Sequence, residues 1–131
     1  MVFYPKDFEF GDKEEERIHP SLIAYFKREI RRKGGRNKHD YECDEYNYEV
    51  KSRKNNYSKY PTTMITADKI CGEKKLILLF NFLDGLYYIE YDKEKFDKYE
   101  IQNFSRARIK TDEKPHIYIP INDLTQLPLI Q

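Results

Sequence analysis

The sequence predicts an α/β fold in which a mixed β-sheet is flanked by helices. Three observations predict it. Residues 40–51 alternate polar and apolar side chains around a short turn, which is typical of a β-hairpin. Residues 76–80, LILLF, form a continuous apolar run, as expected of a central strand that is covered on both faces. Between Pro20 and Ile30, apolar residues recur at helical spacing.

Composition favours one folded domain over residues 1–131. Charged residues make up 36% of the chain and the mean hydropathy is −0.91, values that by themselves suggest disorder. Twelve tyrosines and eight phenylalanines argue for a folded chain, because disordered chains are poor in aromatic residues. A length of 131 residues matches a single domain with a substantial core.

Charge is distributed unevenly although the formal net charge is only +1. Residues 27–38 carry seven bases and one acid, and residues 51–59 carry four bases and no acid. These stretches are either solvated surface or contacts for a polyanion, because the local field decides what a nearly neutral protein attracts.

Several classes of protein are disfavoured. Cys43 and Cys71 provide neither a disulfide framework nor metal-ligand spacing, which favours an intracellular, reducing compartment. The N-terminus is acidic and does not resemble a signal peptide, and the LILLF run is too short to span a membrane. The richness in Lys, Asn, Ile and Tyr indicates an AT-rich genome such as that of a virus or phage.

The first elements follow from local signals. A helix is expected from Pro20, which suits the first helical position, to Gly34-Gly35, which suits a helix end. Its start lies near Glu14 if Pro20 only kinks it. Residues 7–10, DFEF, are a candidate for a short strand.

The hairpin has a predictable register. With the turn at Asp44-Glu45, Tyr41 faces Tyr48 and Asp40 faces Glu49. A register shifted by two residues keeps the same two faces, whereas a shift by one would put acids into the apolar side, so the pattern disfavours it. One face is then apolar: Tyr41, Cys43, Tyr46, Tyr48 and Val50. The other is polar: Asp40, Glu42, Asn47, Glu49 and Lys51.

The rest of the chain is predicted to alternate between helices and strands. Pro61 and Gly72 bracket a predicted helix over residues 62–71, and residues 76–82 form the central strand. Asp84-Gly85 predicts a tight turn before a return strand over residues 86–92. Residues 93–104 form a short helix or a loop, and residues 116–124 form a late strand that Pro120 places at a sheet edge.

The polar face of the hairpin has the chemistry of a phosphodiester-cleaving site. Carboxylates such as Asp40 and Glu49 bind Mg²⁺ through oxygen, and a lysine such as Lys51 can orient water or balance charge on a phosphate. Val50 points to the core, which leaves its backbone carbonyl as a further ligand.

This arrangement resembles the PD-(D/E)xK nuclease superfamily, whose restriction-endonuclease-like core is a helix, a strand with an Asp, a strand ending in (D/E)xK, a helix and another strand. The resemblance covers residues 14–92, with Asp40 as the Asp and Glu49-Val50-Lys51 as the second motif. His39 precedes Asp40 where many members have Pro. The resemblance implies a Mg²⁺-dependent DNA endonuclease, with Mn²⁺ as an alternative metal, and a metal-proximal Glu on the first helix. Glu15 is the preferred residue because it is in helical phase with Leu22 and Phe26.

Nucleic acid would be held through cations around this site. The predicted contacts are Arg31, Arg32, Lys33, Arg36, Arg53, Lys54, Lys59 and Lys69, with Arg106, Arg108 and Lys110 as a third cluster. Tyr57 and Tyr60 are candidates for stacking on bases. No base-reading module is visible, which favours structure-selective or weakly sequence-specific cleavage of DNA, with RNA as an alternative substrate. Cutting both strands would call for a homodimer.

Two other functions compete with the nuclease. One is a non-catalytic nucleic-acid-binding module on the same fold. The other is a structural or interaction protein whose hairpin presents a charged surface to water. Individual residues also have plainer roles: Glu15 as a surface acid, Lys69 in solvent, His19 in local structure, His39 exposed at a strand end instead of assisting at the site, and His116 at a sheet edge.

Overall fold

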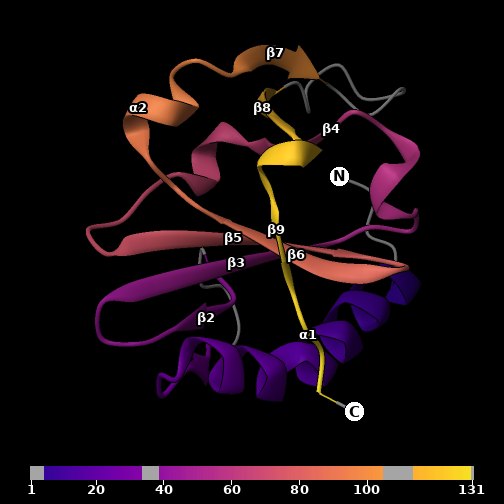
Figure 1. Ribbon diagram of the computed structural model, residues 1–131, viewed down its shortest axis with the longest axis vertical. Coiled ribbons are helices and arrows are strands. Elements are labelled where there is room, and N and C mark those ends of the chain that lie inside the picture. The colour runs from indigo at the N-terminus through magenta and orange to yellow at the C-terminus, as the bar shows by residue number, and fades with distance from the viewer. Residues whose placement is uncertain (1–4, 34–38, 105–113, 131) are drawn as a thin grey trace.

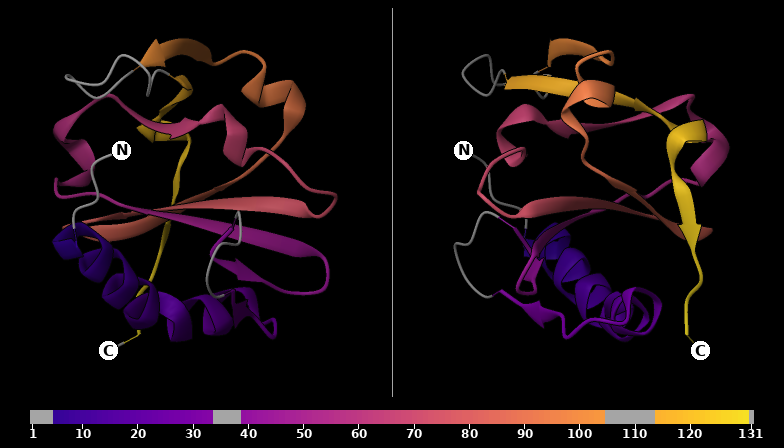
Figure 2. Two further views of the ribbon diagram at one scale, coloured as in Figure 1. Left: turned by 180° about the vertical axis from the view of Figure 1, so that it is seen from behind. Right: turned by 60° about the vertical axis from the view of Figure 1, so that its left-hand side comes forward.

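The computed structural model describes residues 5–33, 39–104 and 114–130, and it confirms a mixed α/β architecture. Three layers are stacked (Figure 1). Helix α1, Pro5–Phe26, covers one face of a six-stranded sheet, and a three-stranded sheet covers the other face. Figure 2 shows the same layers from two other sides.

The six-stranded sheet has the order β1-β2-β3-β5-β6-β9. Its strands β3 and β5 are parallel, and every other neighbouring pair is antiparallel. The bounds are β1 Arg31–Arg32, β2 Tyr41–Glu42, β3 Tyr46–Ser52, β5 Lys75–Phe82, β6 Gly85–Glu90 and β9 Thr125–Leu127.

The three-stranded sheet has the order β4-β8-β7 and is antiparallel throughout. Its bounds are β4 Thr62–Thr66, β7 Glu100–Phe104 and β8 Lys114–Pro120. Short helices connect the strands: η1 Tyr57–Lys59, η2 Ala67–Lys69, α2 Lys93–Phe96 and η4 Ile121–Asp123.

The predicted hairpin and its register are confirmed. Tyr41 is paired with Tyr48, and the Cys43 N–H donates to the Tyr46 carbonyl at 2.9 Å across the turn. Just before the paired residues, the Asp40 N–H donates to the Tyr48 carbonyl at 2.9 Å. The apolar face of the hairpin therefore packs toward α1, as the alternation predicted.

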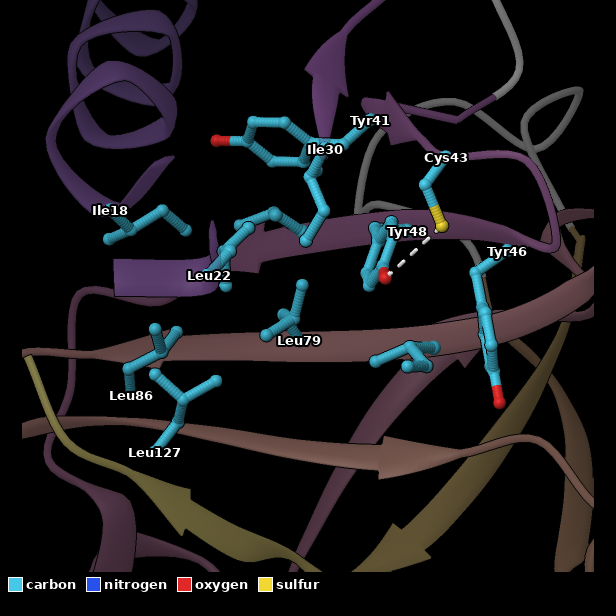
Figure 3. Packing of buried hydrophobic residues seen from close by; sticks show 12 residues of the cluster. Ile18, Leu22, Ile30, Tyr41, Cys43, Tyr46, Tyr48, Leu79, Leu86 and Leu127 are labelled. Atoms are coloured by element: carbon cyan, nitrogen blue, oxygen red, sulfur yellow. Dashed lines mark hydrogen bonds between the residues drawn. The ribbon is translucent and has the colours of Figure 1, made fainter. Parts of the chain in front are cut away.

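Strand β5 is the predicted central strand, buried from Leu76 to Phe82. Its side chains divide between two cores by strand alternation. On the α1 side, Leu79 meets Ile18 and Leu22, with Leu86 and Leu127 from the neighbouring strands (Figure 3). On the other side, Leu76, Leu78 and Phe80 pack with Ile65 of β4 and with Ile117 and Ile119 of β8. This second core joins the two sheets.

The first helix differs from the prediction that it begins at Pro20. It runs from Pro5 to Phe26 with Pro20 inside it, so residues 7–10 are helical and not a strand. It ends because Lys27 takes the left-handed conformation (φ 55°), where its N–H still bonds the Ile23 carbonyl at 2.9 Å. Ile30 reaches the core from the segment after the helix, so its helical spacing was misleading. The expected end at Gly34-Gly35 lies outside the described residues.

The predicted helix over residues 62–71 is wrong. These residues form β4 and the single turn η2. Thr63 and Ile65 are buried while their neighbours are only partly covered, which is the period of a strand, and three threonines favour that conformation. Pro61 therefore precedes a strand and does not open a helix.

The last predicted elements are partly correct. The return strand is β6, and residues 93–104 contain the one-turn helix α2 and then strand β7. The late strand ends at Pro120, after which the chain turns through η4 into β9. Strand β8 is the middle strand of its sheet and not an edge. Pro120 is tolerated there because it is the last residue of the strand.

Candidate active site

Four of the predicted site residues come from three parts of the chain. Glu15 lies on α1, Asp40 directly precedes β2, and Glu49 and Lys51 lie on β3. Glu49 and Lys51 share a face of the strand because they are two residues apart. That face carries Leu78 and Phe80 on the neighbouring β5, so it is the face under the three-stranded sheet.

Asp40 is held against the backbone of the motif. Its Oδ2 accepts a 2.8 Å hydrogen bond from the Val50 N–H. The N–H and C=O of one strand residue point to the same side. The Val50 carbonyl therefore faces the same side as Asp40, as a ligand role would require.

Glu49 is a buried carboxyl between two lysines. Its side chain is only 3% exposed, with Lys51 Nζ 3.6 Å from one oxygen and Lys69 Nζ 3.6 Å from the other. Burial and the charge of Asp40 raise the pKa of Glu49 to about 7, against the opposing effect of the two lysines. Oε1 accepts no hydrogen bond from the described residues, and unpartnered buried oxygens are rare in folded proteins.

Glu15 meets Asp40 from the helix side. Burial raises the pKa of Glu15, and the charge of Asp40 together with a hydrogen bond between the two carboxyls raises it further. The positive charge of Arg32, 4.0 Å from Glu15, lowers the pKa of Glu15 and so opposes this rise. The Tyr41 hydroxyl donates to the Glu15 backbone carbonyl, which fastens this turn of α1 to the hairpin.

Lys69 reaches the site from the single turn η2 and not from the helix predicted over residues 62–71. The buried His39 lies with Nε2 2.9 Å from the Lys69 carbonyl oxygen, so the residue before Asp40 also fixes the turn that carries this lysine. His39 was expected to be exposed, and that expectation is wrong: it is 3% exposed. His19 does serve local structure, since its Nε2 lies 2.7 Å from the Ile30 carbonyl oxygen.

Asn81 is a site neighbour that the sequence analysis missed. It is a buried amide on β5 that donates to Glu14 Oε2 at 2.7 Å and to Ser52 Oγ at 3.2 Å. These bonds hold Glu14, which precedes Glu15, and Ser52, which follows Lys51. The signal was present in the sequence, because Asn81 is the one polar residue within the apolar run of residues 76–82.

The predicted nucleic-acid contacts fall into two groups. Several are engaged with protein groups. Arg32 pairs with Asp12 at 2.7 Å and with Glu16 at 3.8 Å, and Lys33 lies 3.6 Å from Glu42. Arg53 donates to the Met64 carbonyl.

Arg31, Lys54 and Lys59 are exposed, and Arg31 lies 3.8 Å from the equally exposed Asp44. Among the predicted contacts that the structure describes, these three cations have exposed side chains that a polyanion can reach. Arg36, Arg106, Arg108 and Lys110 lie outside the described residues.

The two candidate stacking residues differ from each other. One face of the Tyr57 ring is covered by Tyr87, with centroids 4.0 Å apart and planes at 4°. Its hydroxyl donates to the Ile121 carbonyl at 2.8 Å. Tyr57 is thus a fixed part of the protein and not a free side chain in a basic loop. Tyr60 is 54% exposed.

An open cavity of about 430 Å³ borders the acidic cluster. Glu15, Val50 and Lys51 line it, together with Gly11, Ser52 and Lys54. No atom lies within 4 Å of the place where a side chain at Gly11 would begin. The cavity therefore gives a ligand access to one end of the cluster.

Within the parts of the chain that the structure describes, no three His, Cys, Asp or Glu side chains are arranged to hold a metal ion. The donor chemistry nevertheless suits a hard divalent cation. Burial, together with the charge of Asp40, raises the pKa values of Glu15 and Glu49, and one buried oxygen of Glu49 has no hydrogen-bond donor among the described residues. Glu15 and Asp40 are bonded to each other, so a cation would have to separate them.

None of the helices that the described residues form has the length and apolar character needed to cross a lipid bilayer. Comparison of the chain with protein-family models, with curated proteins and with solved structures gives no significant match in any of the three. The function therefore has to be argued from the site itself.

Proposed function

We propose that this protein is a Mg²⁺-dependent endonuclease that hydrolyses phosphodiester bonds of DNA, with the restriction-endonuclease-like core of PD-(D/E)xK nucleases. One observation carries the proposal: the Asp40 carboxylate, bonded to the Val50 N–H inside the Glu49-Val50-Lys51 motif, interacts with both Glu15 and Glu49. Asp40 thus links Glu15 of the helix with Glu49 of the strand, and two lysines lie beside Glu49.

The order of elements supports this proposal in part. Helix α1, the β2–β3 hairpin and the parallel β3–β5 pair follow the order expected of such a core. The connection from β3 to β5 departs from it, because β4 and η2 stand where the family has a helix. Lys69 then supplies from η2 a cation beside Glu49.

The metal would be held by Asp40, Glu49 and the Val50 backbone carbonyl, with Glu15 as a further ligand. Mg²⁺ suits this oxygen-rich set, and Mn²⁺ is the natural substitute. When bound, such a cation polarises the phosphoryl group and lowers the pKa of its water.

The chain's own residues have distinct tasks in this proposal. Asp40 is oriented by its bond from Val50 and crowds Glu49 electrostatically. Lys51, 3.6 Å from Glu49 and bordering the open cavity, would orient the attacking water or stabilise charge on the phosphate. Glu49, whose pKa is raised to about 7, can hold or release a proton near neutral pH.

Substrate binding would rest on the exposed cations. Arg31, Lys54 and Lys59 contact phosphates in this proposal, which positions nucleic acid without reading its sequence. Cleavage is therefore structure-selective or weakly sequence-specific. A single such site cuts one strand, so cutting of both strands would take a homodimer. The free thiols of Cys43 and Cys71 suit an intracellular, reducing compartment.

A second candidate is a nucleic-acid-binding module without catalysis on the same fold. The hydrogen bond between the Glu15 and Asp40 carboxyls favours it, because these groups are satisfied by each other without a metal. The two candidates agree on the ligand and differ only in the chemistry.

Cleavage assays separate them. Plasmid and branched DNA are incubated with the protein and Mg²⁺ or Mn²⁺, and nicked and linear products are quantified. The wild type should cut, whereas Glu49→Gln and Lys51→Ala should each lose about 100-fold or more of the rate while still binding DNA. Lys93→Ala is the matched control, since Lys93 pairs only at the surface with Asp97. Binding without cutting by the wild type would leave the non-catalytic module as the function.

A further inference from the structure

A second cavity, of about 410 Å³, opens where β3 leads into η1. It shares no lining residue with the cavity beside Glu15 and Lys51. Four aromatic side chains line it: Tyr57, Tyr60, Phe82 and Tyr118. The rest of the lining is Met64, Pro61, the polar residues Asn55, Thr62 and Thr63, and one cation, Arg53. The volume lies within the roughly 300–1,000 Å³ typical of small-molecule sites.

One wall of this cavity is rigid and another can adapt. Tyr57 is fixed by its stacking on Tyr87, by an edge contact with Phe82 at 5.8 Å and by its hydrogen bond to Ile121. Tyr60 is 54% exposed, with the Lys59 ammonium 5.5 Å from its ring. A flat ligand could therefore enter against the fixed wall and be covered by the exposed ring.

Arg53 is the charged side chain in the lining of this cavity. It is partly buried, and burial lowers the pKa of its guanidinium. No carboxylate of the described residues forms an ion pair with it, and it donates one hydrogen bond to the Met64 carbonyl. A guanidinium has five N–H donors, and burying one without a counter-ion is unfavourable unless the other donors find acceptors.

We infer that this cavity binds one unstacked nucleobase of the substrate, with the base against the aromatic walls and Arg53 donating to acceptor atoms on its edge. The inference rests on the proposed nucleic-acid substrate. Bases stack on aromatic side chains, and arginine is the side chain that most often donates to paired acceptors on a base edge. Arg53 lies two residues after Lys51, about 7 Å along an extended chain. A strand with its scissile phosphate at Lys51 thus brings a neighbouring nucleotide to the cavity.

The cavity contains a natural reporter. Met64 lines it, and the chain has only two methionines. With methionine labelled by ¹³C at the methyl group, nucleoside monophosphates (AMP and GMP) are titrated without any metal. The Met64 signal should shift saturably, because a bound base adds its ring current. Ribose 5-phosphate, which has the sugar and phosphate but no base, should leave the signal in place.

Two variants sharpen this experiment. Tyr60→Ala removes an exposed side chain, so the fold should persist, and the Kd for the nucleotide should rise about tenfold. Ile23→Ala is the matched control, because Ile23 is an exposed residue of α1, on the opposite face of the six-stranded sheet, and should leave Kd unchanged.

Base binding at this cavity is overturned if the Met64 signal is unmoved by AMP and GMP, or if ribose 5-phosphate moves it equally. The outcome is independent of the nuclease test. A responding Met64 without DNA cleavage retains the base site and removes the endonuclease. DNA cleavage together with a Met64 signal that does not respond to nucleotide retains the endonuclease and removes the base site.

Discussion

The backbone N–H of Val50 donates a 2.8 Å hydrogen bond to Oδ2 of Asp40. Val50 lies between Glu49 and Lys51, so this bond places the Asp40 carboxylate beside the motif on the neighbouring strand. The sequence predicted that Asp40 and Glu49 face each other. The paired residues of the hairpin end at Tyr41 and Tyr48, and beyond them Asp40 bonds Tyr48 and Val50, while its charge acts on Glu49. The Asp40 carboxylate therefore has two effects. It accepts a backbone hydrogen bond at the end of the hairpin, and its charge helps to raise the pKa values of Glu15 and Glu49.

Replacing Asp40 with Asn separates these two roles. Asp40→Asn keeps an oxygen that can accept from Val50 but removes the charge, so the hairpin should persist. The pKa values of Glu15 and Glu49 should both fall, because the charge of Asp40 helps to raise them. DNA cleavage should drop by about 100-fold or more with the loss of a metal ligand. Carboxyl ¹³C titrations by NMR measure the two pKa values.

The control for this variant is Asp44→Asn, which changes a 97% exposed acid in the turn of the same hairpin. It should leave the titrations of Glu15 and Glu49 and the cleavage rate as in the wild type. Unchanged Glu15 and Glu49 titrations in Asp40→Asn would show that the three carboxyls do not interact.

Glu49 should make the protein less stable as the pH rises. Its pKa is raised from 4.5 to about 7 in the folded protein, so between these values the folded state binds more protons than the unfolded state. The free energy of unfolding then falls with rising pH. The stabilising effect of the bound proton is complete below about pH 4.5 and lost above about pH 7. The difference is on the order of 3 kcal/mol.

Urea denaturation at pH 5 and pH 8 measures this effect in the absence of divalent metal. Glu49→Gln, which stays neutral, should lose less stability than the wild type between these two pH values. Glu90→Gln, at an exposed position of β6, should follow the wild type. If the free energy of unfolding changed equally with pH in Glu49→Gln and in the wild type, Glu49 would be ionised at both pH values. It would then not be the buried carboxyl with a raised pKa described above.

The polar hairpin was predictable because strand alternation leaves few choices. A one-residue slip would have buried acids, so the two faces of the hairpin were fixed by the alternation. The pairing of Tyr41 with Tyr48 also needed the turn to lie at Asp44-Glu45, because a shift by two residues keeps the same faces. The β5 strand was equally clear, since a continuous apolar run needs cover on both faces. The helical spacing between Glu15 and Leu22 predicted that Glu15 lies on the helix face toward the sheet. In the structure Glu15 interacts with Asp40.

The position of Lys69 could not be predicted in the same way. Residues 62–71 have apolar side chains at Met64, Ala67 and Ile70, a spacing of three that also fits a helix, and Pro61 and Gly72 look like helix ends. What decides for a strand is pairing with β8, more than 50 residues later, which local patterns do not contain. The contact of His39 with the Lys69 carbonyl depends on that same long-range packing.

Pro20 misled the sequence analysis for a physical reason that can be tested. A proline inside a helix lacks the N–H that would bond the carbonyl four residues earlier, and it costs about 3 kcal/mol relative to alanine. Because α1 nevertheless continues from Pro5 to Phe26, Ile18 and Leu22 on either side of Pro20 both reach the core. Packing of this face offsets the cost of the proline.

Pro20→Ala should therefore raise the free energy of unfolding by about 1–3 kcal/mol, measured by urea denaturation. The gain is smaller than the full helix penalty because proline also restricts the unfolded chain. Pro61→Ala is the control: Pro61 is exposed before β4, and its loss should lower stability by less than about 1 kcal/mol. If Pro20→Ala left stability unchanged or lowered it, the helix would begin at Pro20 in solution. Glu15, five residues earlier, would then no longer be held on α1 beside Asp40.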